Sequence, residues 1–242
     1  MNTNLCIDIG NSATKCGLFR GEKLVRSYHF DGVFDEYIFR NCFSLYPVAK
    51  VMLCSVKPVN RDFKKYLKTN HQVIEMSHKL RLPVKIKYET PNTLGKDRLA
   101  AVCGAMRLYP RTDLLVIGIG TCITYDLVRS NGDYMGGLIS PGLDMRLKAM
   151  HKFTAKLPLV TRSTNVKLIG FDTTTALQAG GLWGMKAEIS GMMEIFKYKY
   201  DAIKVILAGG GAEYYKKRLK KPIFAHPNLV LLGLNNLLSL NA

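Results

Sequence analysis

The chain has 242 residues, of which 48% are hydrophobic, and its mean hydropathy is +0.02. This length and composition exclude a disordered protein, and no apolar run approaches the ~20 residues of a membrane span. Asp8 and Lys15 interrupt the first apolar stretch, so we expect no signal peptide. Six cysteines occur singly, without the spacing of a zinc site or a disulfide framework, which predicts a reducing, cytoplasmic location.

Basic residues are in excess, with 35 Lys and Arg against 18 Asp and Glu, which gives a net charge of +17. Such a balance favours polyanionic partners, namely nucleotides, phosphorylated metabolites or nucleic acid. The basic clusters are not interleaved with aromatic residues as in a nucleic-acid-binding motif. We therefore expect them to form solvated surface, and we expect neither nucleic acid nor a membrane as the partner.

The first half of the chain predicts a sheet that begins with two hairpins and continues with helices. Glycine turns at 10–12 and 21–22 separate the first three strands. The expected strands are 4–9, 14–19, 23–30 and 48–56, and the expected helical segments are 37–46, 60–68 and 97–109.

The second half predicts a similar succession of strands and helices. Asn131-Gly132 is typical of a hairpin turn, and Gly209-Gly210-Gly211 ends a β-run. The expected strands are 114–119, 123–128, 134–139, 203–208 and a short one at 229–232. The expected helices are 143–152, 174–199, 213–220 and a terminal stretch.

The two halves share a pattern of strand, glycine turn, small polar residue and strand. It occurs at Ile7–Ser12 and again at Ile117–Cys122, each time before a third antiparallel strand and helices. A repeat of more than a hundred residues predicts duplicated α/β domains, at 1–112 and 113–242. No low-complexity linker separates them, so we expect them to pack around a cleft.

The segment Asp8-Ile9-Gly10-Asn11-Ser12-Ala13-Thr14-Lys15 combines a carboxylate, a glycine turn, hydroxyls and a lysine. The carboxylate can hold Mg²⁺ directly or through water, while Asn11, Ser12 and Lys15 face phosphate oxygens. An ordinary hairpin with an exposed lysine explains the segment equally well. The glycine turns at 120–121 and 209–211 favour phosphate binding, although neither a P-loop nor a Rossmann fingerprint is present.

A second segment, residues 91–98, places Asp97 and Arg98 at the start of a helix. The helix dipole there favours anions and lowers the pKa of a carboxylate. Taken alone, the segment favours a simple capping role for Asp97, with Arg98 on the surface.

The order of these motifs along the chain resembles that of type III pantothenate kinases. The resemblance extends over essentially the whole chain and rests on the following segments: Asp8-x-Gly-Asn-Ser12, Gly95-x-Asp-Arg98, Gly120-Thr121, Gly136-Gly137-x-Ile-x-Pro-Gly142, Leu157-Pro158, Asp172-Thr-Thr-Thr-Ala176 with Gly180, and Ala208-Gly-Gly-Gly211. It implies two ribonuclease-H-like domains of the actin, Hsp70 and sugar-kinase superfamily, and a homodimer.

The resemblance implies that ATP phosphorylates the 4′-hydroxyl of pantothenate, the first step toward coenzyme A. Residues Asp8 to Lys15 would bind the ATP phosphates and Mg²⁺, and Thr121 would bind ATP as well. Asp97 would be the base, and in this context catalysis is favoured over capping. The expected pantothenate pocket comprises Tyr88, Gly95, Lys96, Asp97, Arg98 and Thr173. Arg98 can pair with the pantothenate carboxylate as a fork.

Two positions depart from the family pattern. The second hairpin of the family usually reads Asp-x-Gly-Thr, and its aspartate contributes to a K⁺ or NH₄⁺ site at the dimer interface. Gly118 stands at that position here and offers no carboxylate, so we expect weak or absent K⁺ dependence. Lys96 replaces a small residue, and we expect its side chain to face solvent.

Two other functions remain open on the sequence. Some members of the family were first described as accessory factors for transcription, so a nucleic-acid-associated protein is the runner-up; its DNA affinity would fall steeply with salt. The third candidate is a kinase of another small acceptor, such as a sugar. The Gly95–Arg98 block beside Tyr88 favours pantothenate over a sugar by resemblance.

Overall fold

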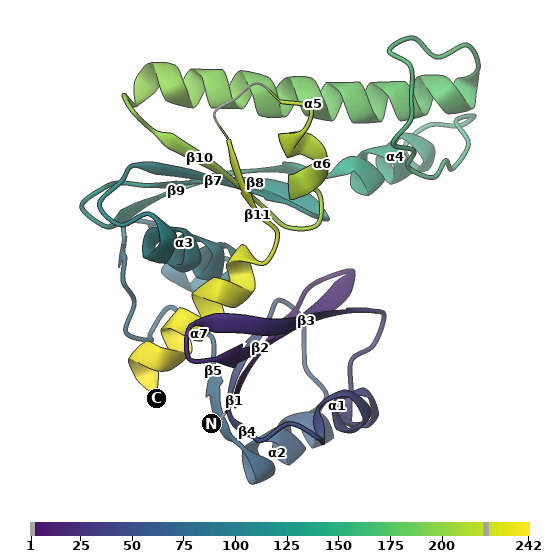
Figure 1. The fold of residues 1–242 in the computed structure, drawn as a ribbon. Helices are drawn as coiled ribbons and strands as arrows, with labels where there is room; N and C mark the ends of the chain where they lie inside the picture. Colours follow the sequence, from purple (N-terminus) through teal and green to yellow (C-terminus); the bar gives the residue numbers. More distant parts are fainter. Residues whose placement is uncertain (1–2, 220–222) are drawn as a thin grey trace. The chain divides into compact units, whose positions relative to one another are not determined.

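A computed structural model describes residues 3–219 and 223–242, which form two β-sheets with helices (Figure 1). Contacts group the chain into two compact units. Unit 1 contains residues 1–112, 128–136 and 228–242, and unit 2 contains residues 113–127 and 137–227. The predicted α/β class is confirmed. None of the helices in the described ranges is both long and apolar enough to cross a bilayer.

The sheet of unit 1 has five strands in the order β3-β2-β1-β4-β5. Strands β1, β2 and β3 are antiparallel, whereas β4 and β5 extend the sheet in parallel with β1. Their bounds are β1 (Thr3–Ile9), β2 (Ala13–Arg20), β3 (Lys23–Asp31), β4 (Val48–Ser55) and β5 (Gln72–Glu75). The sequence predicted the first four of these strands and missed β5.

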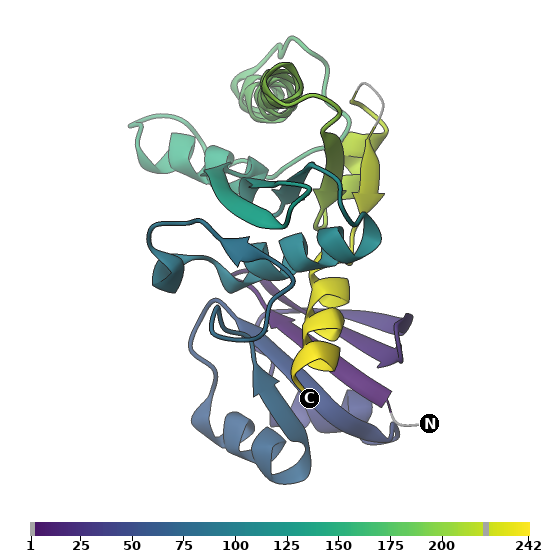
Figure 2. The ribbon, with the colours of Figure 1, turned by 90° about the vertical axis from the view of Figure 1, so that its left-hand side faces the viewer.

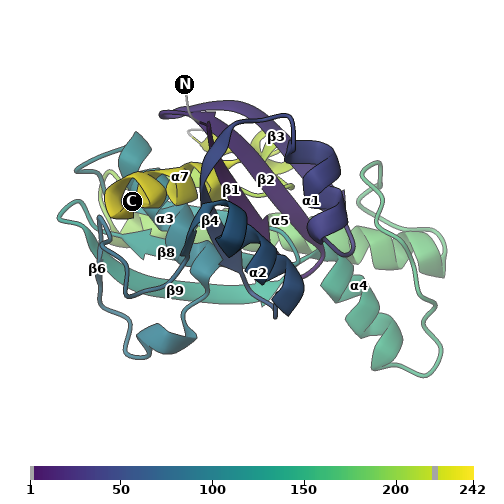
Figure 3. The ribbon, with the colours of Figure 1, turned by 90° about the horizontal axis from the view of Figure 1, so that it is seen from below.

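The two faces of this sheet have different coverings. Leu5, Ile7 and Ile9 of β1 share an apolar cluster with Phe39 of α1 and Phe63 of α2. Because successive side chains of a strand alternate, Asp8 lies on the opposite face. Figure 3 shows α1 and α2 together against the sheet. The helices of unit 1 are α1 (Glu36–Phe43), α2 (Arg61–Asn70), the short η1 (Pro91–Thr93), α3 (Lys96–Leu108) and α7 (Leu229–Asn241).

The strand predicted at 229–232 is wrong, because these residues begin helix α7. The helix buries Leu229, Leu231, Leu234, Leu237 and Leu238, and it packs against both α3 and the sheet of unit 1. A helix that is apolar on most sides does not display a helical period, so its first residues look like a buried strand.

Unit 2 is built on strands whose glycine-rich ends carry the predicted motifs. The second sheet has the order β11-β10-β7-β8-β9-β6, and the chain passes from unit 2 to unit 1 at the end of β8 and back within β9. The strands of this second sheet are β6 (Lys85–Ile86), β7 (Leu114–Ile119), β8 (Cys122–Val128), β9 (Asp133–Pro141), β10 (Lys204–Ala208) and β11 (Phe224–His226). The sequence missed the short strands β6 and β11.

The long helix of unit 2 covers the sheet through its apolar side. Leu182, Met185 and Ile189 of this helix share one core cluster with Leu115 and Ile117 of β7. Figure 2 shows the helix end-on, in green, with α4 nearby. The helices are α4 (Leu143–Lys152), α5 (Thr173–Lys199) and α6 (Ala212–Lys216). Helix α6 is shorter than the predicted 213–220, of which residue 220 lies outside the described residues.

Candidate functional site

A tight hairpin joins β1 to β2 and holds the first predicted phosphate-binding segment. The amide of Gly10 donates to the carbonyl of Ala13 at 3.0 Å, so Asn11 and Ser12 form an exposed tip. Behind the tip, Ile9 pairs with Thr14 and Asp8 pairs with Lys15 across the two strands. The hairpin thus brings the carboxylate and the lysine of the segment side by side.

Asp8 is buried, with 9% of the residue exposed, and its carboxylate is only partly satisfied. It accepts a hydrogen bond from Cys54 on β4, whereas its Oδ1 atom has no hydrogen-bond partner among the described residues. Burial and the nearby charge of Asp97 raise the pKa of Asp8 to about 6, against the opposing effects of Lys15 and Cys54. The pKa shift shows that Asp8, Lys15 and Asp97 share one electrostatic environment.

Asp97 lies in the first turn of α3 and is half-buried. The helix cap is Gly95 and not Asp97, whose Oδ1 accepts a hydrogen bond from the amide of Arg98 at 2.9 Å. A Cβ atom added to Gly95 would come within 2.7 Å of this same oxygen. Glycine at position 95 therefore leaves room for the Asp97 carboxylate beside the end of the helix.

The other residues of the predicted substrate pocket in unit 1 differ in exposure. Lys96 is exposed, as the sequence predicted, although its charge still influences Cys54. Arg98 is buried, with 6% exposed, and so is not the surface residue that a simple capping role would give. Tyr88 packs on Gly136, where an added Cβ would lie 2.8 Å from its ring and where φ is +90°.

Three glycine-containing turns meet in unit 2. The amide of Gly120 donates to the carbonyl of Cys122 at 3.0 Å, which closes the turn that carries Thr121. The amide of Gly211 donates to the carbonyl of Ile119 at 3.2 Å, and that of Gly142 donates to Thr121 at 3.0 Å. Residues 118–121, 142 and 209–211 therefore form one cluster, in which backbone can approach a ligand closely.

Gly118 lies just before this turn, on β7. A Cβ atom at this position would come within 2.7 Å of the Thr124 hydroxyl oxygen on β8. An aspartate would fit here only if Thr124 moved. Thr124 thus occupies the space that a carboxylate at position 118 would need.

Thr173 is the first residue of α5 and is exposed. Asp172 caps this helix, because its side chain accepts from the amide of Thr175 at 2.7 Å and the Thr175 hydroxyl binds back to the Asp172 amide. The capping box accounts for two of the polar residues of the Asp172–Ala176 motif.

Sequence reasoning missed Cys54 as a neighbour of Asp8. Its contact arises from parallel pairing of β1 with β4, which joins residues 46 positions apart. The β-rich composition of 48–56 predicted the strand but not its partner, so no local signal identifies this contact.

The donor set around Asp8 fits a hard divalent cation that is also held by phosphate oxygens. Among the described residues, no group of three His, Cys, Asp or Glu side chains could enclose a metal ion. Asp8 instead offers one buried oxygen without a protein partner. A single carboxylate is the usual protein contribution where Mg²⁺ keeps several waters and binds substrate phosphates.

Comparisons with known proteins point to one family. A sequence profile of type III pantothenate kinase matches residues 4–195. A protein of Christiangramia forsetii named type III pantothenate kinase is 39% identical over 241 residues, which cover 98% of both chains.

Two solved structures are similar in fold. One is a conserved Campylobacter jejuni protein described as a Baf family transcriptional activator, with a TM-score of 0.60, 22% identity and 97% of both chains covered. The other is an inorganic polyphosphate/ATP-glucomannokinase of an Arthrobacter species, with a TM-score of 0.52, 14% identity and 99% of both chains covered. The predicted fold, that of the actin-like ATPases and sugar kinases, is therefore confirmed.

Proposed function

The chain belongs to the type III pantothenate kinase family, and we propose which of its residues carry out the family's reaction. The enzyme transfers the γ-phosphoryl group of ATP to pantothenate, the first step of coenzyme A biosynthesis. Transfer to the 4′-hydroxyl needs a group that takes the hydroxyl proton, donors that hold the phosphates, and charge that neutralises them.

Asp97 takes the proton of the 4′-hydroxyl. Its Oδ1 is oriented by the amide of Arg98, and the glycine at position 95 leaves space beside it. A fixed carboxylate at the nucleophile is sufficient in phosphoryl transfer, because positioning contributes more than covalent chemistry. This orientation is the single observation that supports the role most strongly.

The hairpin from Asp8 to Lys15 binds the ATP phosphates, with Thr121 as a further contact. The amides and hydroxyls at its exposed tip are donors, and Lys15 adds a positive charge. The family uses a divalent metal with ATP, and we propose Mg²⁺ held by the buried Oδ1 of Asp8, directly or through water. Such an ion, when bound, neutralises negative charge on the phosphoryl group during transfer.

Pantothenate is bound by Tyr88, Gly95, Lys96, Arg98 and Thr173. Arg98 is the residue we assign to the pantothenate carboxylate, since a guanidinium can bind both oxygens at once. Its burial favours this role, because a buried charge interacts more strongly than one in water.

A monovalent cation contributes little to turnover by this enzyme. Gly118 supplies no carboxylate, and Thr124 fills the space beside it. We therefore propose that turnover depends weakly or not at all on K⁺ or NH₄⁺.

A homodimer accounts for exposed apolar side chains in unit 2. Phe153, Ile169 and Phe171 are each more than three-quarters exposed in the segment between α4 and α5. Apolar groups gathered on a surface mark association sites. Light scattering with size-exclusion chromatography will measure the mass in solution, and a monomer at micromolar concentration would exclude the dimer.

The six free cysteines favour a cytoplasmic location, because thiols stay reduced there.

The acceptor is tested by product analysis. Purified protein is incubated with Mg-ATP and an equimolar mixture of pantothenate, glucose and mannose, and the products are identified by mass spectrometry. We expect phosphopantothenate and no sugar phosphate. A sugar phosphate without phosphopantothenate would overturn the proposed function.

A further inference from the structure

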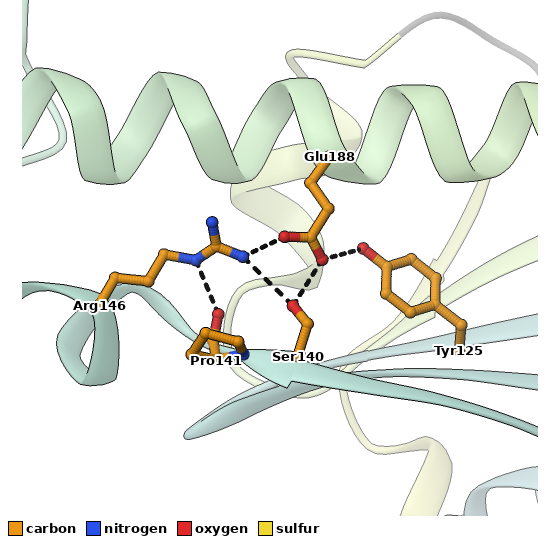
Figure 4. Close-up of polar contacts among 5 residues, drawn as sticks. All are labelled: Tyr125, Ser140, Pro141, Arg146 and Glu188. Carbon is orange, nitrogen blue, oxygen red and sulfur yellow. Dashed lines mark hydrogen bonds and ion pairs between the residues drawn. The ribbon is translucent and has the colours of Figure 1, made fainter. Parts of the chain in front are cut away.

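A network of charged and polar side chains connects four elements of unit 2 (Figure 4). Glu188 of α5 accepts hydrogen bonds from the hydroxyls of Tyr125 on β8, at 2.9 Å, and Ser140 on β9, at 2.5 Å. Its other carboxylate oxygen forms an ion pair with Arg146 of α4. Glu188 is thus held from three elements at once.

Arg146 extends the network to the backbone. Its Nε donates to the carbonyl of Pro141 at 2.8 Å, and one terminal nitrogen donates to the Ser140 hydroxyl at 3.2 Å. The guanidinium therefore binds both the end of β9 and Glu188, as the several donors of arginine allow.

The electrostatics of Glu188 favour its charged form. Burial acts to raise the pKa of Glu188, but hydrogen bonds from Ser140, Arg146 and Tyr125 outweigh it and hold the pKa below its ordinary value. The side chains of Glu188 and Arg146 are only 25% and 22% exposed, so water weakens their attraction less than at an open surface.

The backbone that Arg146 binds lies against the Thr121 turn. Gly142 follows Pro141 directly and donates to the carbonyl of Thr121 at 3.0 Å. A Cβ atom on Gly142 would come within 2.3 Å of the Gly120 carbonyl oxygen, so no space separates the two segments. A shift of Pro141 and Gly142 would therefore displace the turn.

We infer that Glu188 is a positioning residue, which acts through Arg146 to hold the Pro141–Gly142 segment against the Thr121 turn and so sets the affinity for ATP. The inference rests on the proposed contact of Thr121 with ATP. Neither Glu188 nor Arg146 touches a reacting atom in this account. Their effect reaches the Thr121 turn through the Pro141 carbonyl, the Gly142 amide and the Thr121 carbonyl, all of which the structure describes.

The test compares Glu188→Gln with Glu194→Gln, a matched change of an exposed glutamate on the same helix. Loss of the charge that orients Arg146 should raise the Kd of ATP, measured by calorimetry, and the KM for ATP by about fivefold or more. We expect the KM for pantothenate to stay within about twofold in both variants. Glu194→Gln should match the wild type throughout.

Two further variants separate positioning from general stability. Arg146→Lys keeps a positive charge for Glu188 but lacks the fork that also reaches Pro141, so it should raise the KM for ATP as Glu188→Gln does. Tyr125→Phe removes one hydrogen bond and leaves the ion pair, so its KM for ATP should change less than that of Glu188→Gln.

The inference is overturned if Glu188→Gln lowers the melting temperature but leaves the Kd of ATP equal to that of Glu194→Gln. The binding measurement does not depend on the acceptor. A wild-type protein that binds ATP but does not phosphorylate pantothenate would overturn the proposed function and leave the comparison of ATP affinities intact. If Glu188→Gln does not fold, the Kd for ATP of Arg146→Lys decides, and an unchanged value would overturn the inference.

Discussion

Asp8 and Cys54 lie opposite each other in the register of the parallel strands β1 and β4, and the Cys54 thiol donates a hydrogen bond to the Asp8 carboxylate. This bond does not compensate for burial, because the pKa of Asp8 is still raised to about 6. The folded chain therefore keeps a carboxylate where its charge is unfavourable. Such a cost is typical of a site that binds a cation.

Asp8→Asn should stabilise the free protein at neutral pH. A raised pKa means that the protonated form of Asp8 contributes stability below pH 3.8, and that this contribution is lost as the pH rises to about 6. Relative to wild type, the free energy of unfolding of the variant should rise by up to ~3 kcal/mol across this pH window and stay higher above it. Urea unfolding from pH 4 to 8 measures it. A variant less stable than wild type at pH 8 would contradict the account. Kinase activity of the variant should be lost.

Wild-type turnover should not depend on K⁺. Gly118 offers no carboxylate, so replacing K⁺ by a bulky organic cation at constant ionic strength should change kcat/KM by less than about twofold. Initial rates over a K⁺ titration provide the measurement. Saturable activation by K⁺ or NH₄⁺ would show that a site exists without the aspartate.

Gly233→Ala should destabilise the packing of α7 on α3. A Cβ atom on Gly233 would lie 1.8 Å from the carbonyl oxygen of Ala100, which is backbone and cannot rotate away. Overpacking of this kind costs about 1–3 kcal/mol, so the melting temperature should fall. The matched control is Gly184→Ala in α5, where an added Cβ meets no atom within 4 Å. This control should gain ~0.5–1 kcal/mol from helix propensity, and equal effects of the two changes would contradict the packing described.

Local sequence pattern predicted most of the helices and strands, because the hydrophobic pattern and the turn residues that define them lie within short segments. The apolar residues of 4–9 identified a strand, and Gly10 identified the turn that ends it. The error at Leu229 arose where tertiary burial on several sides removed the helical period. The short strands β5, β6 and β11 were missed because two to four residues carry too little pattern.

The site was only partly predictable for a related reason. The motifs around Asp8 and Asp97 are local, but their shared electrostatic environment depends on packing between distant segments. The contact between Arg146 and Glu188 joins residues 42 positions apart on two helices, so no local pattern indicates it. The chemical roles of the site residues could be predicted from their types, whereas the contacts that support them could be identified only from the folded structure.

The role of Asp97 is tested most directly by the rate of ADP release with and without pantothenate, in wild type and in Asp97→Asn. Asparagine keeps the shape of the side chain and an oxygen for the Arg98 amide, but it cannot take the proton of the 4′-hydroxyl. We expect pantothenate-dependent release in wild type and a kcat lower by ~10²–10⁴ in the variant, with the Kd of ATP little changed. Asp62→Asn, in the exposed first turn of α2, is the control and should behave as wild type. Full pantothenate-dependent turnover by Asp97→Asn would contradict the account.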